Sequence, residues 1–117
     1  MNIEDLREYC ISKKGVTEGF PFDETTLVFK VMGKMFALTN TEKEFSINLK
    51  CDPQKAIELR EHYSAVEPGY HMSKKHWNTV TPDNSIDDAL IYLWVDDSYD
   101  LIVSSLTKAK KELLKKV

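Results

Sequence analysis

The chain has 117 residues, a formal net charge of −3, 42% hydrophobic residues and 30% charged residues. This length and composition predict one globular domain over residues 1–117 and exclude an intrinsically disordered chain. The charged N-terminus and the short uncharged stretches predict neither a signal peptide nor a membrane-spanning helix, so we expect a cytoplasmic protein without a membrane partner. Cys10 and Cys51 are then expected to be free thiols in a reducing compartment.

The N-terminal part of the chain is predicted to form a helix and then a β-hairpin. Asn2 is a favourable cap for a helix over about residues 2–14, and Gly15 is a favourable stop. The segment TEGFPFDE that follows is predicted to be a loop. The alternating runs TLVFKVM and KMFALTN then predict a tight hairpin with Gly33 and Lys34 at its turn.

That turn sets the register of the hairpin and the two faces of the sheet. The expected neighbours are Val31 with Phe36, Phe29 with Leu38, Lys30 with Ala37, and Met32 with Met35. A third strand, EFSINLK, alternates strictly, with Phe45, Ile47 and Leu49 on one side. The sheet is therefore expected to have an apolar face for helices and a second face that bears Lys30, Asn48 and Lys50.

A second helix and two short strands are predicted in the middle of the chain. Asp52 is a good N-cap and Pro53 a good first residue for a helix that runs to about Tyr63. This helix is expected to bury its apolar residues, Ile57 among them. Short strands are then expected at 64–70 and 76–80, the first of which the Pro-Gly pair closes.

The C-terminal part of the chain is predicted to be helical. Ser85 is expected to cap a long helical region, in which the polar residues 96–98 indicate a kink or two abutting helices. Thr107 is expected to cap a final, lysine-rich helix. The order of elements predicts an α+β fold: a two-layer sandwich with an antiparallel sheet of about five strands and helices packed on one face.

Four stretches of this sequence resemble the MmcQ/YjbR family. They are FPFDETTLVFKVMGKMFAL (20–38), NLKCDP (48–53), EPGYHMSKKHWNTV (67–80) and DDSYDLIVSSL (96–106), and together they cover most of the chain. The resemblance implies a frataxin-like (CyaY-like) sandwich. It also implies DNA binding through a "double wing" surface, with double-stranded DNA as the candidate partner.

The residues and the resemblance select one candidate nucleic-acid surface. Lysines on the outer sheet face, the hairpin tip and a loop beside Trp77 are expected to contact phosphates. Trp77 is expected to stack on a base or pack under the backbone, and Asn78 to hydrogen-bond a base edge or a phosphate. The candidate residues are Lys30, Lys34, Asn48, Lys50, Lys74, Lys75, His76, Trp77 and Asn78. A structural interpretation stays open beside this one, in which Trp77 covers the rim of the core, Asn78 closes a turn and the lysines are solvated.

Charge is unevenly distributed along the chain. Residues 107–117 hold five lysines and one glutamate, whereas the other 106 residues carry 11 basic and 18 acidic groups. The lysine-rich helix can add phosphate contacts, but the favoured interpretation is a solvated helix whose charges complement its own dipole or pair with the aspartate-rich helix before it. A polyanion must therefore find a local basic patch, because the overall field opposes it.

No catalytic motif is present, so we expect a non-enzymatic binding protein, monomeric and without a cofactor or metal. The sequence contains no Gly-rich phosphate loop, no GxSxG and no HExxH. Two alternatives to DNA binding stay open. One is a protein-interaction or chaperone-like adaptor that uses the same sheet face. The other is a frataxin-like iron binder that uses Glu4, Asp5 and Glu8.

Overall fold

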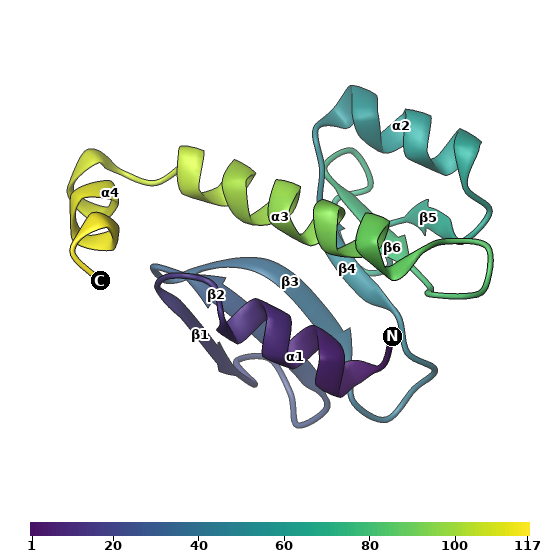
Figure 1. Cartoon of the computed structure of the whole chain (residues 1–117), viewed down its shortest axis with the longest axis horizontal. Coiled ribbons are helices and arrows are strands. Elements are labelled where there is room, and N and C mark those ends of the chain that lie inside the picture. The colour runs from purple at the N-terminus through teal and green to yellow at the C-terminus, as the bar shows by residue number, and fades with distance from the viewer.

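The computed structural model describes residues 1–117 as an open antiparallel sheet with helices on one face (Figure 1). The strands are β1 (Val16–Gly19), β2 (Thr26–Val31), β3 (Lys34–Asn40), β4 (Ile47–Lys50), β5 (Val66–Pro68) and β6 (Trp77–Val80), in the spatial order β1-β2-β3-β4-β6-β5. The helices are α1 (Ile3–Ile11), α2 (Pro53–His62), α3 (Asp88–Ser104) and α4 (Lys108–Lys115). The predicted α+β class is confirmed. None of the helices is long and apolar enough to cross a bilayer.

The sheet has six strands rather than about five, because β1 forms where the sequence predicted a loop. Val16 lies opposite Val31 and Gly19 opposite Val28 at the edge of the sheet. The four residues VTEG carry little strand signal of their own. Pairing with β2 therefore decides their conformation, as tertiary context commonly does for short strands.

The β2–β3 hairpin turns one residue earlier than the sequence predicted. Met32 and Gly33 occupy the turn with φ values of 50° and 86°, and two positive φ values define the tight turn that suits the twist of a hairpin. The observed neighbours are Val31 with Lys34, Lys30 with Met35, Phe29 with Ala37, and Val28 with Leu38. The register shifts between Phe29 and Lys30, where a bulge leaves Phe36 as an extra residue on β3. The adjacent residues Phe36 and Ala37 therefore both face the core, where they are fully buried.

The first two helices begin at the predicted caps. The Asn2 side chain accepts a hydrogen bond from the Asp5 N–H at 2.9 Å, and the Asp5 carboxylate accepts one from the Asn2 N–H at 3.0 Å. Asp52 caps α2, with Pro53 as its first residue. α1 ends at Ile11, earlier than predicted.

α3 is one continuous helix and begins later than predicted. Asp87 is its N-cap residue, while Ser85 instead donates a hydrogen bond to Asp83 in the preceding turn. No break occurs at residues 96–98, because each polar side chain there faces a partner. The Asp96 carboxylate accepts a 2.7 Å hydrogen bond from the Tyr9 hydroxyl.

α4 is capped by Thr107, as predicted, and lies beyond the C-terminal end of α3 (Figure 1). Leu114 is the buried residue of this short helix. A Cβ atom added to Gly15 would lie only 2.5 Å from the Leu114 Cδ1 atom, so the glycine permits this close packing. Ile57 was predicted to be buried but is about half-exposed, as are Leu93 on α3 and Leu113 on α4.

Candidate functional site

The outer face of the sheet, opposite the helices, carries a small apolar cluster of its own. Val28, Leu38 and Trp77 are buried together there, and Met35 and Met72 pack against them. The main core holds the side chains that point the other way along the same strands. The outer face is therefore partly apolar.

The loop between β5 and β6 folds back over this face and covers the tryptophan. The Gly69 N–H donates to the Trp77 carbonyl oxygen at 2.8 Å, and the Tyr70 N–H donates to the Thr79 hydroxyl at 2.9 Å. A Cβ atom on Gly69 would lie 2.8 Å from the Trp77 Cβ atom, so only glycine fits this close approach. The Trp77 side chain is consequently 7% exposed.

The outer face is hollowed into a groove of about 900 Å³, which lies within the range of about 300–1,000 Å³ typical of ligand sites. We call it the outer groove. Its walls are the β1–β2 loop, the β3–β4 loop and the β5–β6 loop, and its floor is formed by strands. The lining residues used below are Phe22, Asp23, Met35, Lys43, Glu44, Ser46, Asn48, Tyr70, His71, Met72, Trp77 and Thr79.

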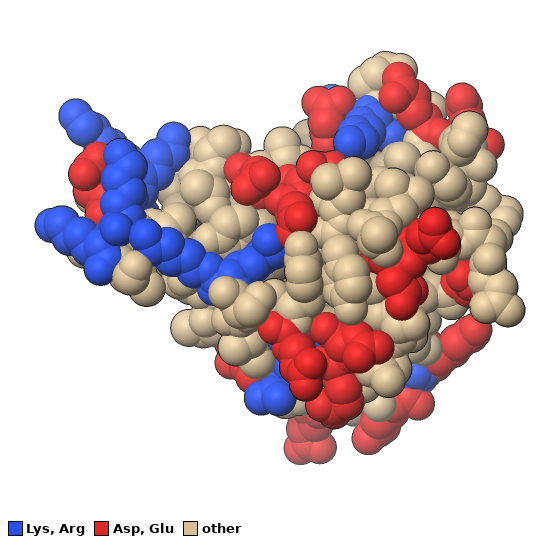
Figure 2. Space-filling model, in the orientation of Figure 1, with Lys and Arg blue, Asp and Glu red and all other residues tan.

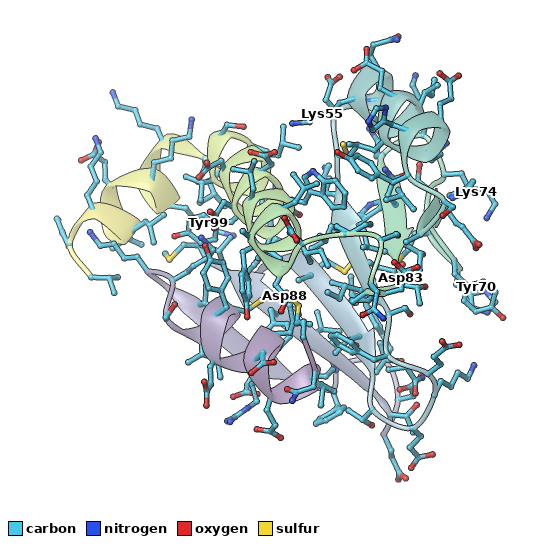
Figure 3. All side chains as sticks on the ribbon, turned by 45° about the vertical axis from the view of Figure 1, so that its right-hand side comes forward. Lys55, Tyr70, Lys74, Asp83, Asp88 and Tyr99 are labelled. Carbon is cyan, nitrogen blue, oxygen red and sulfur yellow. The ribbon has the colours of Figure 1, made fainter.

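Two aromatic side chains stand exposed on the rim of the outer groove. Phe22 is 65% exposed and Tyr70 is 59% exposed, and Figure 3 shows Tyr70 projecting from the edge of the molecule below Lys74. Asp23 holds the loop that carries Phe22, since its carboxylate accepts hydrogen bonds from the N–H groups of the two threonines that follow, at 3.0 and 2.6 Å. These hydrogen bonds hold the pKa of Asp23 below its usual value.

Tyr70 is also held by its neighbours. Its ring lies 4.0 Å from the His71 ring, centroid to centroid, and the Lys43 ammonium lies 5.9 Å from the Tyr70 ring centroid. His71 has a φ of 57°, in the left-handed region that non-glycine residues seldom occupy. The β5–β6 loop thus presents its aromatic side chain in a defined position.

Some polar groups on the groove floor form hydrogen bonds within the chain, and one does not. The Thr79 hydroxyl donates to the Asn48 Oδ1 atom and accepts from the Tyr70 N–H. The Nδ2 group of Asn48 makes no hydrogen bond within the chain, and Asn48 is half-buried in the groove. An amide donor is therefore available to a ligand at the floor.

Some of the residues predicted from the sequence as nucleic-acid contacts share this side of the sheet. Lys30, Asn48 and Lys50 lie on the outer face as expected, and Lys50 is the cross-strand neighbour of Trp77. Lys30 lines a separate depression beside the β1–β2 loop. Of the predicted residues, only Asn48 and Trp77 line the outer groove itself.

The remaining lysines do not form one platform. Lys34, at the hairpin tip, points to the helical layer and donates to the carbonyl oxygen of Ser105 at 3.4 Å. Lys74, Lys75 and His76 are exposed together on the β5–β6 loop, where the Lys74 ammonium donates to the Gly69 carbonyl oxygen at 3.2 Å. The lysines of the hairpin tip and of the β5–β6 loop therefore point in different directions.

Asn78 lies in the core and not on the candidate surface. It is 2% exposed, its Oδ1 atom accepts a 2.6 Å hydrogen bond from the Arg60 Nε–H, and its Nδ2 group donates to the Ala56 carbonyl oxygen at 3.3 Å. Asn78 thus fastens α2 to β6 and is not accessible to a ligand. Trp77, nearly covered, cannot offer its ring face for base stacking.

The exposed aromatic residues Phe22 and Tyr70 were not predicted from the sequence as site residues. A local signal was present, because each of these aromatic residues lies in a segment that contains proline and glycine, and such loop segments lie on the surface. The sequence does not indicate that the two residues line the same groove, since they are separated by 48 positions.

The titratable groups of the chain do not assemble a metal site or a reactive thiol. No group of three or more His, Cys, Asp and Glu side chains is placed to hold a metal ion. Burial raises the pKa of the Cys10 thiol to about 12 and also raises the pKa of Cys51, and both cysteines are free thiols. Raised pKa values disfavour the nucleophilic thiolate.

The chain is similar in sequence and in structure to several known proteins. The YjbR family model matches residues 11–101. The chain is 36% identical to the Escherichia coli (strain K12) protein YjbR over 97% of this chain and 98% of that protein. It is 42% identical to YbdF of Escherichia coli O157:H7 over 76% of this chain and 74% of that protein, and both relatives are described as uncharacterized. The crystal structure of a Deinococcus radiodurans protein with a DUF419 domain matches with a TM-score of 0.90 at 39% identity, covering 97% of this chain and 88% of that one.

Proposed function

This chain belongs to the YjbR family, and we propose that it is a non-enzymatic binding protein whose outer groove holds an extended segment of another protein. The observation that carries this proposal is the combination of exposed Phe22 and Tyr70 on the rim with Met35 and Met72, which line the groove beside the apolar cluster. Exposed aromatic side chains are typical anchors at protein interfaces. Methionine side chains adapt their shape to apolar partners.

The charges of the outer groove favour a protein segment over a polyanion. Its lining holds one cation, Lys43, against the carboxylates of Asp23 and Glu44. A phosphate backbone would gain no net attraction from this set. An extended peptide needs hydrogen-bonding partners for its backbone, and the Asn48 amide on the floor and the Ser46 hydroxyl on the β3–β4 loop line the groove and can supply them.

Double-stranded DNA is the second candidate partner, and one observation favours it. Lys74, Lys75 and His76 are consecutive, exposed and free of any ion pair with a carboxylate. With Lys50 on the neighbouring strand they would contact phosphates, while Lys34 and Asn78 would take no part. Such binding would lose affinity steeply with salt and discriminate poorly between sequences.

A selection experiment tests the proposal. A randomised peptide library displayed on phage is selected on the immobilised protein, and the enriched peptides are synthesised and titrated against it. We expect peptides with aromatic or large apolar residues whose affinity falls about tenfold or more in a Phe22→Ser/Tyr70→Ser variant, because the anchors are lost. Leu93→Ser, which removes a half-exposed apolar residue on α3, is the matched control and should leave affinity unchanged.

The peptide titration, set beside a titration with duplex DNA, distinguishes the two candidates. If no peptide is enriched, or if the enriched peptides bind the Phe22→Ser/Tyr70→Ser variant as tightly as the original chain, the groove proposal is contradicted. Duplex DNA that binds at low salt and is lost in a Lys74→Glu/Lys75→Glu variant would support the second candidate instead.

A further inference from the structure

Seven lysines from three parts of the chain gather at the end of the molecule formed by α4. The set, which we call the basic end, is Lys14, Lys34, Lys108, Lys110, Lys111, Lys115 and Lys116. In Figure 2 blue atoms cover α4 and continue from it toward the middle of the molecule, with few red atoms among them. Only Lys115 has an ion pair, with Glu112 at 3.5 Å. Most of this positive charge is therefore not neutralised within the chain.

Two of these lysines are fixed at the basic end by hydrogen bonds to the ends of helices. The Lys34 ammonium donates to the carbonyl oxygen of Ser105, the C-cap residue of α3. The Lys14 ammonium donates to the carbonyl oxygen of Lys115 in the last turn of α4, at 3.0 Å. A cation at a helix C-terminus is favourable because that end carries partial negative charge. These contacts explain the positions of two lysines, and among the other five only Lys115 has a side-chain partner, Glu112 of the same helix.

A cleft of about 280 Å³ opens between these lysines. Its rim is formed by Lys14, Lys111 and Lys115, and its floor by Val103 and Leu114. The cleft thus combines three cations with an apolar floor. It shares no lining residue with the outer groove.

We propose that the basic end binds an acidic segment of a partner protein that carries apolar residues among its carboxylates. In this arrangement carboxylates pair with Lys14, Lys111 and Lys115, and one apolar side chain enters the cleft against Val103 and Leu114. The rest of the chain is net acidic and repels such a segment, which directs the partner to this end. The inference goes beyond the proposed function, because it concerns a second surface with a different partner chemistry.

The shape of the cleft favours an acidic peptide over other polyanions. A duplex backbone presents phosphates but no apolar group to fill the space above Val103 and Leu114. A bilayer surface is broad and flat, so its acyl region does not reach into a concave site between three lysines. A peptide alternating acidic and apolar residues supplies both features.

Fluorescence anisotropy with a labelled synthetic peptide tests this proposal. The probe alternates aspartate or glutamate with leucine, and two control peptides replace either the acidic residues by their amides or the leucines by serine. We expect the probe to bind at low salt, both controls to bind about tenfold or more weakly, and added salt to weaken the complex.

Charge-reversal variants locate the site on the chain. Lys111→Glu/Lys115→Glu should weaken binding of the probe about tenfold or more, whereas the matched control Lys74→Glu/Lys75→Glu should not change it. If the first pair disturbs folding, which circular dichroism would reveal, Lys108→Glu/Lys116→Glu is the second test, because these exposed lysines lie at the first residue and the C-cap of α4. We expect this pair to weaken binding as well.

Several results would overturn the proposal. They are a folded protein that does not bind the probe, an equal loss in the Lys74→Glu/Lys75→Glu control, or binding indifferent to the leucines of the probe. A fourth is tighter binding of duplex DNA or phosphatidylserine vesicles than of the probe, abolished by Lys111→Glu/Lys115→Glu. Because none of these outcomes involves Phe22 or Tyr70, they leave the proposed role of the outer groove untouched.

Discussion

The hydroxyl of Ser98 on α3 accepts a 2.9 Å hydrogen bond from the backbone N–H of Lys50 at the end of β4. The same hydroxyl donates to the Phe36 carbonyl oxygen on β3 at 2.6 Å. Pairing of β3 with β4 covers only Ala37 with Leu49 and Leu38 with Asn48. The buried Ser98 hydroxyl therefore takes the place of the next ladder hydrogen bond and fastens the long helix to the centre of the sheet.

Ser98→Ala is expected to lower the free energy of unfolding by about 1–3 kcal/mol, because a buried N–H and a buried carbonyl lose their partner together. Urea denaturation followed by circular dichroism measures the change. Ser104→Ala is the matched control on the same helix, since the Ser104 hydroxyl is exposed and bonds only to the Leu101 carbonyl oxygen of its own turn. A Ser98→Ala variant as stable as the Ser104→Ala control would contradict this role.

The polar run Asp96-Asp97-Ser98 also shows where local sequence signals mislead. Three polar residues predicted a break, yet α3 continues through them because partners elsewhere in the chain satisfy each one. Asp97 forms a 3.1 Å ion pair with Lys55 of α2, and Ser98 bridges two strands. These partners lie far away along the chain, so no local pattern indicates them. Caps such as Asn2 and Asp52 were predictable because their partners are only two or three residues away.

Asn78→Ala and Asn48→Ala should separate folding from binding. Asn78→Ala leaves the Arg60 guanidinium and the Ala56 carbonyl oxygen without their buried partner, so we expect a loss of about 1–3 kcal/mol in unfolding free energy. Asn48→Ala removes a half-buried amide that lines the outer groove. The loss of peptide-binding free energy in Asn48→Ala should therefore exceed its loss of unfolding free energy.

Urea denaturation and titration with a selected peptide measure both effects in both variants. Equal stability of the two variants would show that the hydrogen bonds of Asn78 do not hold α2 to β6. Unchanged peptide affinity of Asn48→Ala would remove Asn48 from the site.

Gly69→Ala should displace the loop that covers Trp77. The added methyl group would meet the Trp77 Cβ atom at 2.8 Å and the Trp77 carbonyl oxygen at 2.9 Å, so we expect a loss of about 1–3 kcal/mol from overpacking. Acrylamide quenching of Trp77 fluorescence, measured in a Trp94→Phe background, should increase. Gly19→Ala is the matched control, because nothing lies within 4 Å of its added Cβ atom. Identical quenching in both variants would contradict the covering role of this loop.

Alkaline pH should destabilise the protein through Tyr9. The hydrogen bond to Asp96, together with burial, raises the pKa of the Tyr9 phenol from 10.0 to about 12. A pKa raised by folding means that the stabilising contribution is complete below pH 10 and is lost as the pH rises toward about 12. Urea midpoints across this interval should fall less in Tyr9→Phe than in the original chain, with burial of Cys10 accounting for part of the remaining fall. Parallel curves for the two proteins would contradict the assignment to Tyr9.

The candidate site was less predictable than the fold for a physical reason. Alternation along each strand placed Lys30, Asn48 and Lys50 correctly on one face, because side-chain direction in a strand is local. The path of a loop is not local. The β5–β6 loop folds back through the hydrogen bond between Gly69 and Trp77, which hides the indole ring and brings Tyr70 to the rim. The direction of Lys34 likewise depends on where α3 ends.

Methionine methyl NMR tests the role of the outer groove most directly, because the chain has four methionines and only Met35 and Met72 line the groove. Met32 packs against the main core and is the internal reference. With methyl-labelled protein and a peptide enriched in the library selection, we predict that saturation shifts the resonances of Met35 and Met72 and leaves that of Met32 in place. A saturating peptide that leaves the Met35 and Met72 methyl resonances unmoved would contradict binding in the outer groove.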